Sequence, residues 1–185
     1  MALNDIPYTI IHRKVKYPRL EFKTGELVII LPEGEELGDL LEKHSKWIER
    51  KQKFIAECIE EASTKEIIHR SQEEFRNLIS EKVKEITQEL NLKINKILYR
   101  KMKTKWASMS PRKNLTINPL MKYLPEHLIE YILYHEITHL IQKHHNQNFW
   151  SIIEKKFNNY EELEKELFVY WFLMKGRDYE KGGSL

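Results

Sequence analysis

The chain has 185 residues, of which 41% are hydrophobic and 32% are charged, and its formal net charge is +3. This composition is typical of a folded globular protein rich in solvated helices. The single Cys58 excludes an internal disulfide and a cysteine-based zinc site. No run reaches the ~18 apolar residues needed to span a membrane, and the first residues lack the apolar core of a signal peptide. We therefore expect a cytoplasmic protein with no membrane partner.

The first half of the chain predicts a small sheet followed by two long helices. Residues 6–32 predict β structure, with a turn at residues 23–26, and we expect a small antiparallel sheet there. Residues 35–62 carry apolar side chains at helical spacing and predict one long helix. A second long helix is predicted to begin at Ser71, because Ser71 and Glu74 form a capping box.

The second half predicts strands and then helices. Residues 94–118 predict a strand from Ile94 to Trp106 and a second one that ends at Asn118, with a turn at residues 111–114 between them. A helix follows Pro125, a residue that suits a first helical turn. Two shorter helices are predicted near residues 147–158 and 160–175. We group the chain into four regions of one structural unit: 1–34 as the N-terminal β region, 35–92 as a long helical pair, 93–175 as the catalytic core, and 176–185 as a flexible tail.

The string His135-Glu136-Ile137-Thr138-His139 has the pattern H-E-x-x-H and lies in the predicted helix after Pro125. Two histidines four residues apart share one helix face, so both imidazoles can reach one metal ion. Glu136 is placed to act as the base toward a water molecule at that metal. Isolated histidines are usually surface or capping residues, but five of the eight histidines cluster between residues 127 and 145.

A hydrolytic metal site needs three protein ligands and one open position. His145 has the spacing of the metzincin pattern, although Gln142 stands where that pattern has Gly. This assignment requires the helix to stop near Lys143, so that the polar run 143–148, with Asn as a left-handed cap, turns the chain back. The alternative third ligands are the neighbouring His144 and three glutamates of the last helix, Glu161, Glu162 and Glu166.

Several motifs resemble one known family. The stretch from Lys103 to Ser110 is similar to its K-T-R-W-G-S-C-S signature, with Ala107 in place of Gly and Met109 in place of Cys. Asn118 lies where the family has L-N before the Pro that opens its H-E-L-x-H-L helix. His145 and Phe149-Trp150 match N-H-S-x-x-F-W, with His144 in place of Asn. Further matches upstream are Leu31-Pro32 and Trp47-Ile48. The family is that of the YgjP-like metallopeptidases, relatives of the SprT-like and WLM proteins.

The resemblance implies a zincin-like α+β fold with zinc held by His135, His139 and His145, and Glu136 as the general base. It also implies that an edge strand beside the metal helix pairs with an extended peptide. The residues expected to contact substrate are Lys105, Trp106, Ser108, Arg112 and Asn118. The candidates for stabilising the oxyanion are Tyr131 and Arg112.

Charge is unevenly distributed along the chain. Nine basic residues and no acidic residue lie between Asn91 and Pro125, so the remainder of the chain is net acidic. Lysines on a solvated strand pair account for such a run without any function. Alternatively, the segment lines the cleft and attracts an anion, either phosphate groups or an acidic peptide.

The sequence therefore predicts a zinc metallopeptidase acting on peptide or protein. One alternative is a metal-dependent nucleoside triphosphate (UTP) pyrophosphatase on the same site, an activity associated with the family. A second alternative is a nucleic-acid-binding protein that contacts its partner through residues 93–113 and holds a structural zinc closed by a fourth ligand.

Overall fold

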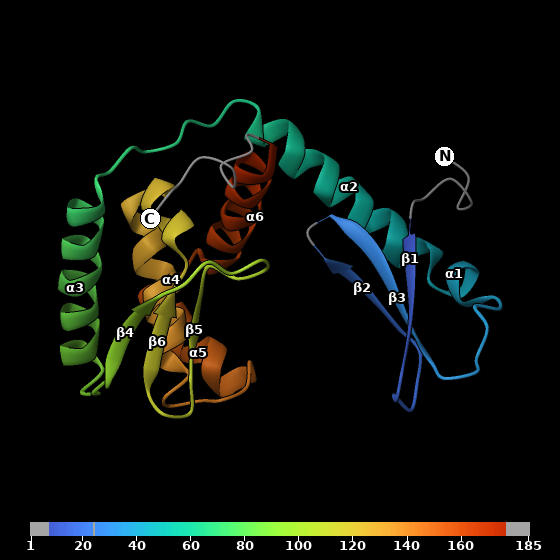
Figure 1. Ribbon diagram of the computed structural model, residues 1–185, viewed down its shortest axis with the longest axis horizontal. Helices are drawn as coiled ribbons and strands as arrows, with labels where there is room; N and C mark the ends of the chain where they lie inside the picture. Colours follow the sequence, from blue (N-terminus) through green and yellow to red (C-terminus); the bar gives the residue numbers. More distant parts are fainter. Residues whose placement is uncertain (1–7, 24, 177–185) are drawn as a thin grey trace. The chain divides into compact units, whose positions relative to one another are not determined.

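The computed structural model describes residues 8–23 and 25–176, and the chain divides into two compact units, residues 1–63 and 64–185. Each unit combines a three-stranded sheet with helices (Figure 1). The predicted α+β class is confirmed. The boundary separates the two long helices that the sequence grouped within residues 35–92, so that each unit contains one of them.

The sheet of the N-terminal unit contains β1 (Tyr8–Arg13), β2 (Arg19–Lys23) and β3 (Glu26–Pro32) in the order β1-β3-β2. β2 and β3 form the expected antiparallel hairpin, whose turn includes Gly25 at φ 92°. The expectation of a purely antiparallel sheet is wrong, because β1 pairs with β3 in parallel. β3 is buried from Leu27 onward and takes the central position, where both of its edges are paired.

The predicted helix over residues 35–62 is shorter and interrupted. It consists of α1 (Leu40–Lys43) and α2 (Ser45–Ala62), separated at His44. Its late start follows from Gly38, whose φ of 51° lies in the left-handed region and is incompatible with a continuous helix.

The core of this unit joins one face of β3 to α2. Residues two apart in a strand share a face, and this core contains Leu27, Ile29, Leu31 and Ile48, all at most 1% exposed. Cys58 on α2 is also buried.

The second unit begins with α3 (Gln72–Glu89), and the predicted capping box is confirmed. The Ser71 Oγ accepts the Glu74 N–H at 3.1 Å, and the Glu74 carboxylate accepts the Ser71 N–H at 2.7 Å. These two bonds satisfy backbone donors that the first helical turn leaves without partners. The buried stripe of α3 consists of Phe75, Ile79, Val83 and Ile86.

The second sheet contains β4 (Lys96–Tyr99), β5 (Ala107–Met109) and β6 (Asn114–Ile117) in the order β4-β6-β5. Its arrangement repeats that of the first sheet, with one parallel and one antiparallel neighbour of the central strand. The predicted strand from Ile94 to Trp106 is wrong beyond Tyr99, where the chain leaves the sheet until Ala107.

Asn118 explains this departure from the sheet. Its side chain is fully buried, and its amide donates to the carbonyls of Met102 and Lys105, each at 2.9 Å. The Asn118 N–H also donates to the Trp106 carbonyl at 2.8 Å. A buried amide requires such partners, and here they hold the segment before β5 in an irregular path.

The C-terminal part is built around one central helix. The 3₁₀ helix η2 (Pro119–Tyr123) leads into α4 (Glu126–Thr138), which is followed by α5 (Gln147–Lys156) and α6 (Tyr160–Gly176). α4 packs against α3, β5, α5 and α6, and Figure 1 shows it behind the second sheet. The two predicted C-terminal helices are confirmed, and the predicted tail beyond Gly176 lies outside the described residues.

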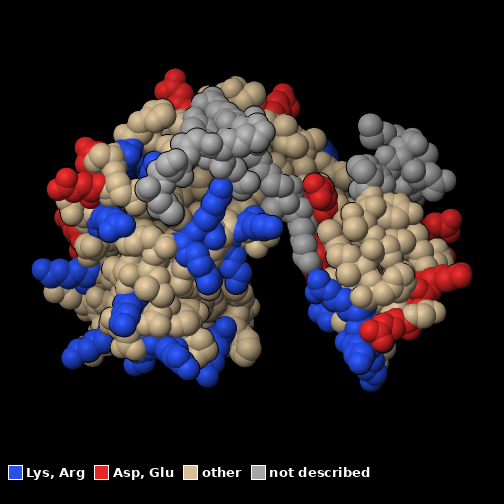
Figure 2. Space-filling model, in the orientation of Figure 1, with Lys and Arg blue, Asp and Glu red and all other residues tan. Residues whose placement is uncertain are grey.

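On the face of the second unit drawn in Figure 2, Lys and Arg side chains spread over the surface and acidic side chains lie mainly at its margins. Among the helices of residues 8–23 and 25–176, none has the length and apolar content required to cross a bilayer.

We expect Ser71→Ala to lower the free energy of unfolding of the second unit by about 1 kcal/mol, because it removes the helix cap. Denaturant titration followed by circular dichroism measures this change. Ser80→Ala is the matched control, since it makes the same chemical change at an exposed position inside α3, where Ala is the better helix former. Equal destabilisation by both substitutions would contradict a stabilising role for the cap.

Candidate metal centre

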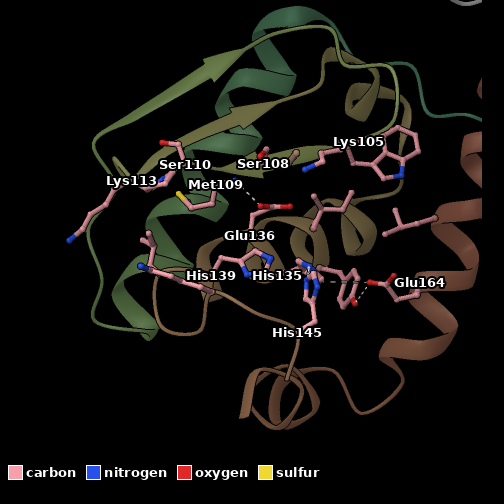
Figure 3. Close-up of a pocket in the computed structure, with 18 residues that line it drawn as sticks. Lys105, Ser108, Met109, Ser110, Lys113, His135, Glu136, His139, His145 and Glu164 are labelled. Carbon is pink, nitrogen blue, oxygen red and sulfur yellow. Dashed lines mark hydrogen bonds and ion pairs between the residues drawn. The ribbon is translucent and has the colours of Figure 1, made fainter. Parts of the chain in front are cut away.

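Three histidines converge where α4 ends. His135 lies in the last turn of α4, His139 is its C-terminal cap residue, and His145 lies just before α5. One ring nitrogen of each lies within 4.8 Å of the others, and Figure 3 shows the three imidazoles below Glu136.

The early end of α4 makes this convergence possible. The helix stops at Thr138 rather than near Lys143, and the chain then turns. A helix that continued past His139 would direct His145 away from the other two imidazoles. Asn146 is not a left-handed cap of α4, because its side-chain oxygen accepts the Phe149 N–H at 3.0 Å and begins α5.

The ring of Phe149 supports all three imidazoles. It is fully buried, and its centroid lies 4.9 Å from that of His135, 4.8 Å from that of His139 and 4.7 Å from that of His145. His145 also stacks on Trp150, which in turn stacks on Tyr160. These contacts orient the His145 ring, although His145 lies outside the helices.

The ring nitrogens suit a metal ion. His139 Nδ1 lies 3.1 Å from the Gln142 carbonyl oxygen, which can only accept, so Nδ1 carries the proton and Nε2 has its lone pair free. The Nε2 atoms of His135 and His145 face each other at 2.9 Å. Burial lowers the pKa of His135 to about 3 and also lowers the pKa of His145. Both imidazoles are therefore neutral near pH 7, the form that binds metals.

A carboxylate from α6 lies behind His135. Glu164 Oε1 is 3.8 Å from His135 Nδ1, an atom that is buried and has no hydrogen-bond partner among the described residues. The Tyr131 hydroxyl donates to the same carboxylate oxygen at 2.5 Å. Burial and Glu164 raise the pKa of Tyr131, which keeps it a donor. A carboxylate in this position orients a ligating histidine and raises its basicity.

The sequence analysis did not identify Glu164, although it named its neighbours. Glu161 and Glu162 are exposed, and Glu166 binds Lys65 at 3.1 Å and His127 at 2.9 Å. None of these three lies in the histidine cluster, and the exposed His144 does not lie in it either. Glu164 shares a helix face with Leu167 and Trp171, and this spacing was the signal available in the sequence.

Glu136 is held between α4 and the edge strand β5. One of its carboxylate oxygens accepts the Met109 N–H at 2.7 Å. Burial raises the pKa of the Glu136 carboxyl, and the Met109 N–H, His139 and Lys105 partly oppose this increase. The second oxygen is available to a water molecule or a substrate, and Figure 3 shows the carboxylate above the imidazoles.

A cleft of about 820 Å³ opens over this centre. Of the predicted substrate residues, Lys105, Trp106 and Ser108 line it, and Trp106 also packs edge to face on Trp171. Arg112 is exposed and Asn118 is buried, and neither is among the residues that line the cleft. Tyr131 is a supporting residue rather than an oxyanion donor, because its hydroxyl is bound to Glu164.

A carboxylate fixed between an edge strand and a cluster of three histidines, beneath an open cleft, provides the machinery of a metal-dependent hydrolase. The same arrangement explains why the sequence has the H-E-x-x-H pattern, which is typical of zincin-like proteins.

The family model for the YgjP-like metallopeptidase domain matches residues 57–169, more than half of the chain, and the protein belongs to this family. Two crystal structures are similar in part, and both are of metallopeptidase zymogens. Abylysin of Pyrococcus abyssi is 24% identical and jannalysin of Methanocaldococcus jannaschii 33% identical, with TM-scores of 0.47 and 0.44. Each alignment covers 50% of this chain, and 93% and 87% of those chains, respectively. No curated protein matches the chain.

The residues fit zinc, the usual metal of such proteins. Three imidazoles are a ligand set that zinc prefers, and a fourth position facing a cleft is characteristic of catalytic sites. The buried His135 Nδ1 has no hydrogen-bond partner among the described residues, and the Glu164 carboxylate 3.8 Å away lies where the outer-shell partner of a zinc-binding histidine is found.

We expect His145→Ala to weaken zinc binding by more than the roughly 10–100-fold that loss of an outer-shell partner causes, because a direct ligand is lost. Competition with a chromophoric chelator measures this affinity. His144→Ala is the matched control, because it removes an exposed imidazole from the adjacent position. If zinc affinity were unchanged in His145→Ala and reduced in His144→Ala, His144 would be the third ligand instead.

We expect Glu164→Ala to weaken zinc binding about 10–100-fold, because His135 loses the carboxylate behind its Nδ1. The same competition assay applies, and the visible spectrum of the cobalt-substituted protein reports the ligand geometry. Glu162→Ala changes an exposed glutamate on the same helix and should have no effect. Identical zinc affinities for the two variants would contradict a positioning role for Glu164.

Proposed function

We propose that this protein is a zinc-dependent peptidase with Glu136 as its general base. The observation that carries the proposal is the position of Glu136, which is bound to the Met109 N–H and lies beside the cluster of three histidines. Bound there, zinc would supply a Lewis acid that acidifies a water molecule and polarises the scissile carbonyl.

Glu136 can move the proton that this reaction requires. The Met109 N–H fixes one of its carboxylate oxygens, so the other is free to take a proton from water and return it to the leaving amine. Its raised pKa makes it a stronger base than an exposed glutamate. Ile132, Leu140 and Leu167 also line the cleft and give part of its wall an apolar surface.

The shape of the cleft supports a polypeptide substrate. Among the described strands, β5 has a partner along one edge only, which is β6. Ala107, Ser108 and Met109 of β5 also line the cleft. A short strand beside a cleft suits an extended chain, because backbone hydrogen bonds can add a further strand to the sheet.

We expect Glu136→Gln to lower the rate of peptide hydrolysis by about 10²–10⁴-fold while retaining one zinc per chain, because only proton transfer is lost. Hydrolysis of unfolded casein and metal content by mass spectrometry are measured on the same samples. Glu154→Gln is the matched control, since it makes the same change on the exposed surface of α5.

Full activity in Glu136→Gln would refute the assigned base. Zinc-loaded wild-type protein that hydrolyses UTP but no peptide would replace the peptidase with a nucleotide pyrophosphatase on the same site. Salt-sensitive nucleic-acid binding that survives Glu136→Gln, with no hydrolysis of either substrate, would indicate a binding protein with a structural zinc.

A further inference from the structure

Every charged group that lines the cleft and is not engaged in a hydrogen bond is a cation. Lys105, Lys113 and Lys143 line the cleft and are exposed. The two carboxylates of the wall are engaged, Glu136 by the Met109 N–H and Glu164 by the Tyr131 hydroxyl. Within the described part of the chain, none of the three lysines forms an ion pair. The three lysines outnumber the two carboxylates of the lining, so a substrate in the cleft meets an excess of positive charge.

The positions of the lysines follow from the backbone around β5. Lys105 precedes the strand, and its carbonyl is held by Asn118. Lys113 follows the strand, and its N–H donates to the Ser110 carbonyl at 2.9 Å in a turn where its φ is 57°. Figure 3 shows Lys105 and Lys113 on opposite sides of Glu136. The positive charge is thus distributed along the cleft on both sides of the catalytic carboxylate.

This distribution suits an extended acidic peptide better than a phosphate group. Phosphate sites gather donors around one point and favour arginine, whose planar guanidinium binds oxygens in pairs. Here the cations are lysines, and two of them lie on opposite sides of Glu136. An extended peptide along β5 would place residues near both ends of the strand. An Asp or Glu side chain at either place would lie near a lysine.

We propose that the enzyme selects acidic polypeptide segments, with Asp or Glu flanking the cleaved bond, and that Lys105, Lys113 and Lys143 determine this preference. The proposal rests on the peptidase activity proposed above. Opposite charges within a cleft raise both the rate of encounter and the selectivity for one substrate class, and like charges exclude the other class.

The test compares two fluorogenic peptides that are identical except for Glu or Lys on both sides of a cleavage site first mapped in casein by mass spectrometry. We expect the zinc-loaded wild type to show about tenfold higher kcat/KM for the Glu peptide, because each exposed charge pair contributes a few-fold. Added sodium chloride should reduce this ratio, since salt screens exposed charges.

The charge-reversal variant Lys113→Glu/Lys143→Glu should abolish or invert the preference. The control variant Lys84→Glu/Lys96→Glu changes net charge equally at exposed positions of α3 and β4 that are not among the cleft-lining residues, and should keep the preference. Equal kcat/KM for both peptides in the wild type, or an unchanged ratio in Lys113→Glu/Lys143→Glu, would overturn the proposal.

The remaining outcomes separate this inference from the proposed function. Cleavage of both peptides without charge preference leaves the peptidase intact and overturns only the selectivity. Failure of the zinc-loaded wild type to cleave casein or either peptide overturns the peptidase and the selectivity together. Binding of a single-stranded DNA oligonucleotide that is lost in Lys113→Glu/Lys143→Glu, with no peptide preference, would assign the positive surface to nucleic acid instead.

Discussion

The buried ring of Phe149 touches all three histidines, and the metal centre depends on this contact. His135 and His139 belong to the end of α4, whereas His145 comes from the turn that follows. Only the docking of α5, which carries Phe149, brings the two groups together. An aromatic ring can fill this position because it presents apolar surface to several imidazoles while leaving their outer nitrogens free. The geometry of the site is therefore a product of core packing.

The second determinant is the path of the chain before β5. The buried Asn118 binds the carbonyls of Met102 and Lys105, and so fixes the segment that leads to Met109. The Met109 N–H in turn binds the Glu136 carboxylate. A single amide at the end of β6 thus aligns the edge strand with the metal helix. Sequence reasoning assigned Asn118 to substrate contact, because a motif shows that a residue matters without showing which way its side chain faces.

Local signals predicted the parts of the fold that local physics determines. Three such features could be predicted from the sequence: the capping box at Ser71, the H-E-x-x-H pattern and the two C-terminal helices. Each depends on residues within one or two helical turns. The direction of the strands could not be predicted, because contacts between distant segments decide the parallel pairing of β1 with β3. The end of α4 at Thr138 was also missed, since tertiary packing of the following turn overrides helix propensity. The role of Glu164 depends on how α6 meets α4.

The three histidines differ in their access to solvent, and this difference would determine how a metal ion reaches them. The side chain of His135 is only 17% exposed, the adjoining Phe149 is fully buried, and His145 is exposed. An ion bound by the three histidines would therefore enter and leave past His145. Metal exchange would then depend on the short turn between α4 and α5, in which His145 stacks on Trp150.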